Sequence, residues 1–164
     1  MKNLFLSILL VATVTACESN APNEDSSAVA MIEAEDVNNF NCINAQADNA
    51  ISTSEAKTNI VGEWQLKAIL TMIPNNEVPN IVLKVNNDLS VTVTKAGKKV
   101  HEDKLKISKE SGENYSVLKI ESSRGEFSNG DFNFLYGNLR VCEKELFIDN
   151  GVAFDAPGYF FRKM

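Results

Sequence analysis

Hydrophobic and polar residues alternate along residues 64–72, and this pattern predicts the first strand of the fold. The apolar positions of one face are Trp64, Leu66, Ala68, Leu70 and Met72. The residues between them are polar, with Ile69 as the one exception. Alternation of this length is typical of a β-strand with one buried face. Because the chain contains a single tryptophan, we expect the core to form around Trp64.

Short alternating segments with turn signals between them continue to the end of the chain. The further predicted strands lie near 81–85, 89–94, 105–107, 115–121, 127–136, 139–141, 146–148 and 159–162. The fourth predicted strand, around Leu105 and Ile107, is heavily charged, as expected of an edge or a solvent-facing rim. Asn129-Gly130 is either a hairpin turn or a bulge inside a longer strand. Neighbours joined by tight turns pair antiparallel, and closing the sheet removes exposed edges. The sequence therefore predicts an all-β protein, a small antiparallel up-and-down barrel of about eight strands.

The segment before the barrel divides into two parts. Residues 1–16 combine a basic Lys2, an apolar run from Leu4 to Val14 and a small Ala16. This arrangement is typical of a secretory signal peptide, because the apolar run is too short to span a bilayer. Residues 17–59 are polar, which predicts a flexible acidic tether, and the barrel domain is expected over residues 60–164. Weak helical spacing over Ala28–Asn39 allows a short helix, and Phe40 with Cys42 suggests a docking point.

Charge is concentrated in the tether. Residues 18–59 hold eight acidic residues and one lysine, a net charge of −7, whereas residues 60–164 hold fourteen of each sign. An acidic segment beside a membrane is repelled by anionic headgroups, so it would hold the domain off the surface. The neutral barrel has no basic stripe, which argues against a nucleic-acid partner.

Three cysteines have different expected fates. Cys42 and Cys142 remain as a pair after the signal segment, and in an oxidising compartment they could form a disulfide. The alternative is two buried free thiols, and spacing along the chain does not decide between them.

The residues Val14-Thr15-Ala16-Cys17 resemble the lipobox of bacterial lipoproteins. The resemblance implies cleavage before Cys17, diacylglycerol on its sulfur and further acylation such as palmitate. Acyl chains contribute roughly 0.8 kcal/mol per buried CH2, so two or three anchor a protein firmly. Glu18 follows the cysteine, which by resemblance to sorting rules favours the outer membrane of a Gram-negative envelope, facing the periplasm or the cell surface.

Gly62-Glu63-Trp64 resembles the Gly-x-Trp signature of lipocalins, and residues 60–164 are similar to the small lipocalin-like lipoproteins of Bacteroidetes-type bacteria. The matching positions are Gly62, Trp64 and Leu66 at the start and Tyr159, Phe161 and Lys163 at the end. The resemblance implies that Arg162 packs across Trp64 and closes the barrel base. The domain is short for a carrier lipocalin and has no long carboxy-terminal helix. A META-type or lysozyme-inhibitor-like barrel shares the size and lipidation but lacks Gly-x-Trp.

No catalytic residue, metal site or cofactor is predicted. His101 is the only histidine, and it lies in a charged strand, so a zinc-type cluster cannot be assembled from it and the cysteines. Nucleophile-elbow, P-loop and dinucleotide motifs are absent from the sequence. A pair of carboxylates meeting in space, as in glycosidases, is the remaining enzymatic alternative.

Two non-enzymatic functions follow from the aromatic residues. An apolar pocket for a small hydrophobic ligand would use Trp64, Leu66, Phe132, Phe134, Tyr136 and Phe161. Its mouth would lie beneath the Pro74–Asn80 and Asp149–Pro157 loops. The alternative is a solid core, in which case the barrel would act as a protein-binding module, such as an envelope inhibitor or assembly factor. If Tyr159 and Phe161 both point inward, Phe160 faces outward, where it could mark a contact patch.

Overall fold

The computed structural model describes residues 30–46, 50–73, 75–123 and 133–164. The predicted signal segment, Cys17, Phe127, Phe132 and the Asn129-Gly130 turn lie outside the described residues. In the part of the chain that is described, no helix has the length and apolar character needed to cross a membrane.

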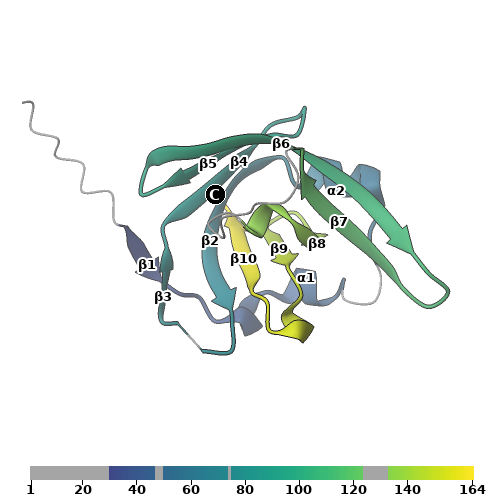
Figure 1. The fold of residues 1–164 in the computed structure, drawn as a ribbon, viewed down its shortest axis with the longest axis horizontal. Coiled ribbons are helices and arrows are strands. Elements are labelled where there is room, and N and C mark those ends of the chain that lie inside the picture. The colour runs from purple at the N-terminus through teal and green to yellow at the C-terminus, as the bar shows by residue number, and fades with distance from the viewer. Residues whose placement is uncertain (1–29, 47–49, 74, 124–132) are drawn as a thin grey trace, which may run out of the picture.

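Eight antiparallel strands close into a barrel, which confirms the predicted fold class (Figure 1). The strands are β2 (Gly62–Leu70), β4 (Ile81–Val85), β5 (Ser90–Lys95), β6 (Lys98–Ser111), β7 (Ser116–Ser122), β8 (Gly137–Val141), β9 (Glu145–Asp149) and β10 (Gly158–Lys163). Each pairs with its neighbour in the chain, and β10 closes the barrel by pairing with β2. In most of these strands alternate residues point inward and form one continuous core around Trp64. The predicted inward face of β2 is wrong after Leu66, because the pairing of β2 with β10 shifts register there. Ala68 and Leu70 pack in a separate cluster outside the barrel, Ile69 packs against the main core, and Met72 lies beyond the strand and is exposed.

One of the two alternatives for the charged strand and the predicted strand around Phe134 are wrong. The charged strand is not an edge, because β6 pairs with β5 on one side and with β7 on the other. Its charged residues instead alternate with inward-facing Leu105 and Ile107. The segment around Phe134 is a 3-10 turn, η2 (Asn133–Leu135), and not a strand. Within this turn the neighbouring side chains of Phe134 and Leu135 are both buried in the main core.

The predicted tether over residues 17–59 is wrong for its described part, which packs against the barrel. Residues 30–46, which we call the strap, contain β1 (Met31–Glu33), a 3-10 turn η1 (Val37–Asn39) and α1 (Asn41–Asn44). β1 pairs antiparallel with β3 (Glu77–Pro79), so the weak helical spacing over Ala28–Asn39 does not form a helix there. The predicted docking point is confirmed, because Phe40 is fully buried.

A short helix, α2 (Thr53–Asn59), follows the strap and covers one end of the barrel. Ser52 accepts a hydrogen bond from the Glu55 N–H, which caps the first turn. Ala56 and Ile60 are buried in the same core as Trp64. The strand directions place the opposite end, which we call the loop end, at residues 71–73, 75–76, 95–98 and 150–157. In Figure 1, α2 lies at the upper right, and the β5–β6 hairpin and the loop after β2 lie at the left and lower side.

Candidate functional site

The described residues of the predicted ligand pocket fill the barrel interior. Trp64, Leu66 and Phe161 are 0% exposed and Phe134 is 2% exposed. The rings of Phe134 and Phe161 pack edge to face with their centroids 6.1 Å apart. A side chain with no accessible surface has no water-sized space beside it, so these residues form a packed core. Tyr136 is 51% exposed and does not join them.

Lys163, and not Arg162, lies over the tryptophan. The Lys163 Nζ atom is 5.1 Å from the Trp64 ring centroid and donates a hydrogen bond to the Asn59 carbonyl. The prediction for Arg162 is wrong by one residue. In β10 the inward position of Phe161 is followed by an outward one, so Arg162 faces the strap while Lys163 pairs in register with Trp64.

Gly62 is required beside this lysine. Its φ is +137°, and a Cβ atom built there would lie 2.6 Å from the Lys163 Cε atom. The Gly-x-Trp signature thus has a local physical cause in this chain: glycine admits the lysine stem over the indole. The Trp64 Nε1–H donates to the Ile60 carbonyl at 2.7 Å, which satisfies the one polar atom of the buried ring.

Arg162 instead joins the strap to the barrel wall. Its guanidinium donates to Glu35 and to Glu145, with nitrogen–oxygen distances of 2.5 and 2.6 Å, and its Cζ atom lies 4.0 Å from the Phe40 ring centroid. The hydrogen bond to Glu35 is the largest cause that raises the pKa of Arg162 above its ordinary value, and partial burial opposes it. The arginine therefore stays charged and holds two carboxylates from distant parts of the chain.

Phe160 faces outward, as expected, but is not a free contact patch. It is 5% exposed and packs against Phe40 and Phe147, with ring centroids 5.0 and 4.4 Å apart. These residues belong to a second, smaller core between the strap and the outer wall of β2, β9 and β10. The strap thus covers the outward-facing apolar surface around Phe160, which was predicted to be a possible contact patch for a partner.

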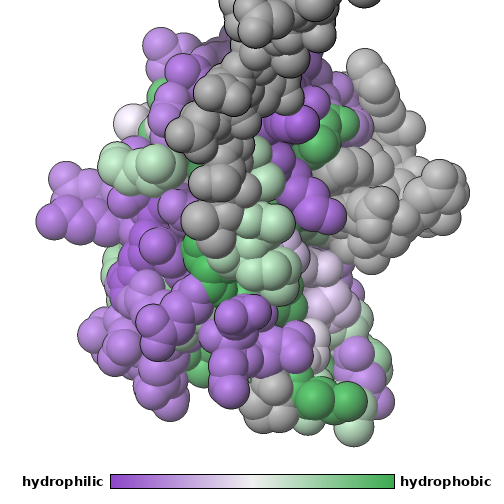
Figure 2. All heavy atoms as spheres, turned by 90° about the vertical axis from the view of Figure 1, so that its left-hand side faces the viewer, coloured by the Kyte–Doolittle hydropathy of each residue, from purple (hydrophilic) through white to green (hydrophobic). Residues whose placement is uncertain are grey.

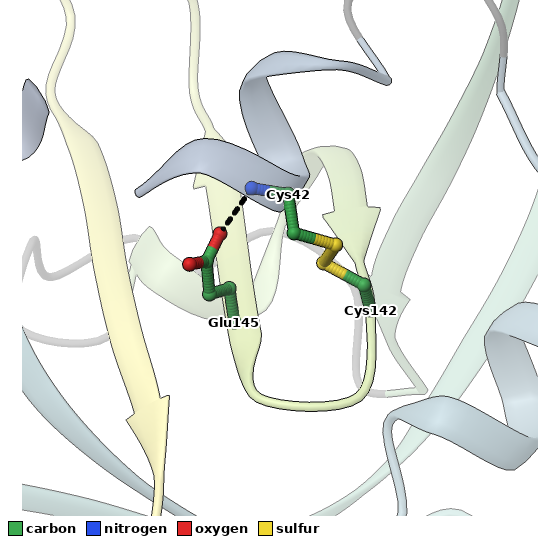
Figure 3. Close-up of side chains that lie close together, drawn as sticks. All are labelled: Cys42, Cys142 and Glu145. Carbon is green, nitrogen blue, oxygen red and sulfur yellow. Dashed lines mark hydrogen bonds between the residues drawn. A yellow bond between two sulfur atoms is a disulfide. The ribbon is translucent and has the colours of Figure 1, made fainter. Parts of the chain in front are cut away.

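Cys42 and Cys142 form a disulfide that fastens the strap beside this second core (Figure 3). Their Cα atoms are 6.5 Å apart and 100 residues apart in sequence. The Glu145 side chain points toward α1 and accepts hydrogen bonds from the backbone N–H groups of Cys42 and Ile43, at 2.8 and 3.2 Å. Cys42, Cys142 and Glu145 have metal-ligating atoms within 4.8 Å of one another. The two sulfurs bond each other, and the Glu145 carboxylate pairs with Arg162. These contacts therefore join the strap to the barrel, and the three groups do not form a metal site.

His101 lies beside a buried carboxylate near the loop end. Its Nε2 atom is 3.7 Å from Asp103 Oδ2, and the Ser122 hydroxyl also donates to this oxygen. Ser123 donates to the other carboxylate oxygen at 2.5 Å. In a nucleophilic triad the imidazole lies between the hydroxyl and the carboxylate, whereas in these contacts the carboxylate lies between the other two groups. This arrangement fastens β6 to the end of β7.

A wide hollow opens beside β1 and β3, on the face that Figure 2 shows. Its two adjoining parts have volumes of about 650 and 690 Å³. The apolar lining residues are Ala34, Met31, Ile69 and Pro79, and the acidic ones are Glu33, Glu35, Asp36 and Glu77. Figure 2 shows hydrophobic atoms at the centre of this face between hydrophilic ones. The hollow can therefore receive an apolar side chain that is accompanied by positive charge.

Three large apolar side chains project from the loop end. Met72, Ile73 and Phe154 are 78%, 76% and 88% exposed. A groove of about 180 Å³ between the two loops is lined by Leu70, Thr71, Met72, Val152, Asp155 and Ala156. Phe154 belongs to the Asp149–Pro157 loop that was expected to cover a ligand mouth, and Met72 and Ile73 precede the other such loop. This end of the barrel thus presents apolar side chains to the outside.

Several residues of these sites were not predicted from the sequence. Glu35 and Glu145 appeared as ordinary members of an acidic tether and a charged turn, and Asp103 as part of a solvated strand. A signal was available only for Lys163, because counting outward from Phe161 at period two places it on the Trp64 side. Comparison of the chain with protein-family models, with curated proteins and with solved structures gives no match.

Proposed function

We propose that this protein is a lipid-anchored envelope lipoprotein whose solid barrel binds another protein and does not carry a small ligand. The observation that carries the second half of this proposal is the packed interior: Trp64, Leu66 and Phe161 have no accessible surface. Ligand pockets in proteins are usually largely formed before the ligand binds. A carrier of this size would need to displace its own core aromatic residues, at a cost of several kcal/mol.

The anchor is supported by the residues Val14-Thr15-Ala16-Cys17 and by the resemblance of this sequence to the lipobox. Lipidation of Cys17 would hold the protein at a membrane of the cell envelope, with the outer membrane favoured by Glu18. An oxidising compartment also agrees with a disulfide that joins distant segments. Lipidation is tested by flotation of the full-length protein with membranes, which the Cys17→Ser variant should lose.

The hollow beside β1 and β3 is the surface that we assign to the partner. Its exposed acids Glu33 and Glu77 flank the apolar Met31 and Pro79. Charge complementarity indicates an occupant that combines basic residues with an apolar side chain. A protein segment of that composition fits the described surface better than an anionic or purely apolar molecule does.

The experiment is capture of cross-linked partners by the lipidated protein in its own envelope. We expect a stoichiometric protein partner that is lost in the Glu33→Lys/Glu77→Lys double variant and on raising the salt concentration. Glu113 and Glu143 are also exposed, so Glu113→Lys/Glu143→Lys is the matched control and should retain the partner. Native mass spectrometry of the same protein that reveals a stoichiometric apolar ligand would instead support the carrier function.

A further inference from the structure

We propose that the loop end of the barrel inserts into the surface of the bilayer that holds the lipid anchor, through Met72, Ile73 and Phe154. This inference rests on the proposed lipidation of Cys17. The first observation is the exposure of these side chains, each more than three quarters open to solvent. Met72 lines one groove with Val152, Asp155 and Ala156 of the other loop. Ile73 and Phe154 are next to these lining residues in the chain, so we treat the three side chains as one apolar tip.

The loop that presents Phe154 is held in place by its own hydrogen bonds. The Asp149 carboxylate accepts from the N–H groups of Gly151 and Val152, both at 2.7 Å. The Phe154 N–H donates to the Gly151 carbonyl, which closes the turn η3 (Val152–Phe154). Val152 packs back against the second core. Phe154 therefore projects from a formed turn, which reduces the ordering that insertion requires.

The chain leaves the barrel at the same end. The Ala30 carbonyl accepts a hydrogen bond from Asn80, and the Asn80 carbonyl accepts one from Ala96 in the β5–β6 hairpin. Twelve residues, 18–29, separate Ala30 from Cys17, a length that spans at most about 40 Å. An anchor at Cys17 keeps the loop end within this distance of the bilayer. The effective concentration of lipid near the apolar tip is therefore high.

The charges of the two loops indicate what kind of lipid contact is possible. Residues 71–76 and 150–157 contain no lysine or arginine and one acid, Asp155. These two loops therefore bind through burial of apolar side chains at the headgroup boundary. Attraction to anionic headgroups would come from Lys95 and Lys98 of the β5–β6 hairpin at the same end. We expect insertion into zwitterionic vesicles, with little dependence on salt concentration.

The test uses the full-length lipidated protein in phosphatidylcholine vesicles that contain brominated acyl chains. Phe154→Trp adds a tryptophan at the tip, while Trp64 is fully buried and gives a constant background. We expect the added emission of Phe154→Trp to fall by roughly half or more, since side chains at this depth reach the acyl boundary. Tyr115→Trp is the matched control, because Tyr115 is 59% exposed on the β6–β7 hairpin, away from the loop end. Its emission should not change.

Three outcomes would overturn the proposal. Flotation with the vesicles but equal quenching of the two variants would exclude selective insertion while leaving the lipid anchor intact. Failure to float would refute the anchor itself, and with it the inference that depends on it. A concentration-dependent blue shift of Phe154→Trp without vesicles would assign the tip to contact between two copies of the chain. Replacing Met72 and Ile73 with serine in Phe154→Trp should reduce the quenching if the tip acts as a unit.

Discussion

Gly62 and Lys163 explain why glycine precedes Trp64 by two residues: the lysine side chain passes close to the Gly62 backbone. Gly62 adopts φ +137°, and its missing Cβ leaves room for the lysine stem. Lys163 in turn lies against Trp64, the largest fully buried side chain. The motif is therefore a property of barrel closure, because it joins the first strand of the barrel to the last.

Gly62→Ala should lower the free energy of unfolding by about 1–3 kcal/mol, because alanine at this φ is strained and meets the lysine. Urea unfolding followed by Trp64 fluorescence measures the change. Gly112→Ala is the control, since the φ of Gly112 lies outside the left-handed region and its Cβ would meet only the exposed ring of Tyr115. Equal losses in the two variants would contradict this explanation.

Arg162 should matter more to stability than an ordinary surface cation. Arg162→Met keeps an apolar stem near Phe40 but leaves Glu145, which is 7% exposed, without its positive partner. We expect a loss of about 2–3 kcal/mol, reduced from the value for a fully buried pair by the partial exposure of the arginine. Lys84→Met removes an exposed ion pair with Glu63 and should cause no measurable change. Similar urea midpoints for both variants would show that the Arg162 pairs contribute little.

The strap and the barrel strands differ in how far the sequence predicts them. Most strands of the barrel alternate at period two, and this period identifies the inward face without any knowledge of the fold. It fails where pairing shifts register, as in β2 after Leu66. Elements of the strap have three or four residues each, too few to display a period. Their order depends on contacts with Phe160 and Arg162, more than one hundred residues away. Phe40 and Cys42 could be predicted as a docking point, but the surface that receives them could not.

The candidate sites follow the same division. Inward positions such as Trp64, Leu66 and Phe161 were correctly grouped, because alternation determines which residues share a face. Whether the grouped residues enclose space depends on the volumes of side chains from eight strands, which no local pattern contains. The apolar tip was missed for a different reason. Met72 was predicted on the inward face of the first strand, but β2 ends at Leu70, and no local pattern indicated that Phe154 is exposed.

The disulfide should stabilise the strap and barrel together. Cys42→Ala/Cys142→Ala removes a crosslink that spans 100 residues, for which the chain-entropy estimate is about 4–5 kcal/mol. We expect a fall of that order in the free energy of unfolding, measured with urea. The wild-type protein with a thiol reductant should approach the value of the double variant. Equal free energies of unfolding for the oxidised and reduced protein would contradict this prediction. They would mean that the crosslink does not restrict the unfolded chain.

On the scale of the whole molecule, strap and barrel form one folded body. The second core lies outside the closed sheet and includes residues from both, among them Phe40, Ile43, Phe147 and Phe160. The outer wall of β9 and β10 is therefore an interior surface of the protein. This explains why the barrel holds apolar residues on its outside as well as in its described interior.

A chain that begins at residue 50 should expose this wall. Relative to a chain that begins at residue 30, it loses the buried Phe40 and Ile43, each worth about 1.5–3 kcal/mol, together with the disulfide. We expect lower stability, stronger binding of a hydrophobic dye and aggregation at high concentration. Size-exclusion chromatography and dye fluorescence of the two chains measure the difference. A stable, monomeric shorter chain would show that the strap is dispensable for the fold.

The position of the strap also determines when it can dock during biosynthesis. Residues 30–46 emerge from the ribosome early, but their partners Cys142, Glu145, Phe160 and Arg162 are among the last to be made. Nothing that this segment binds on β9 and β10 exists until translation has almost finished. The leading part of the polypeptide thus stays undocked while the rest is produced, a state that agrees with export of an unfolded chain before oxidation fixes its final form.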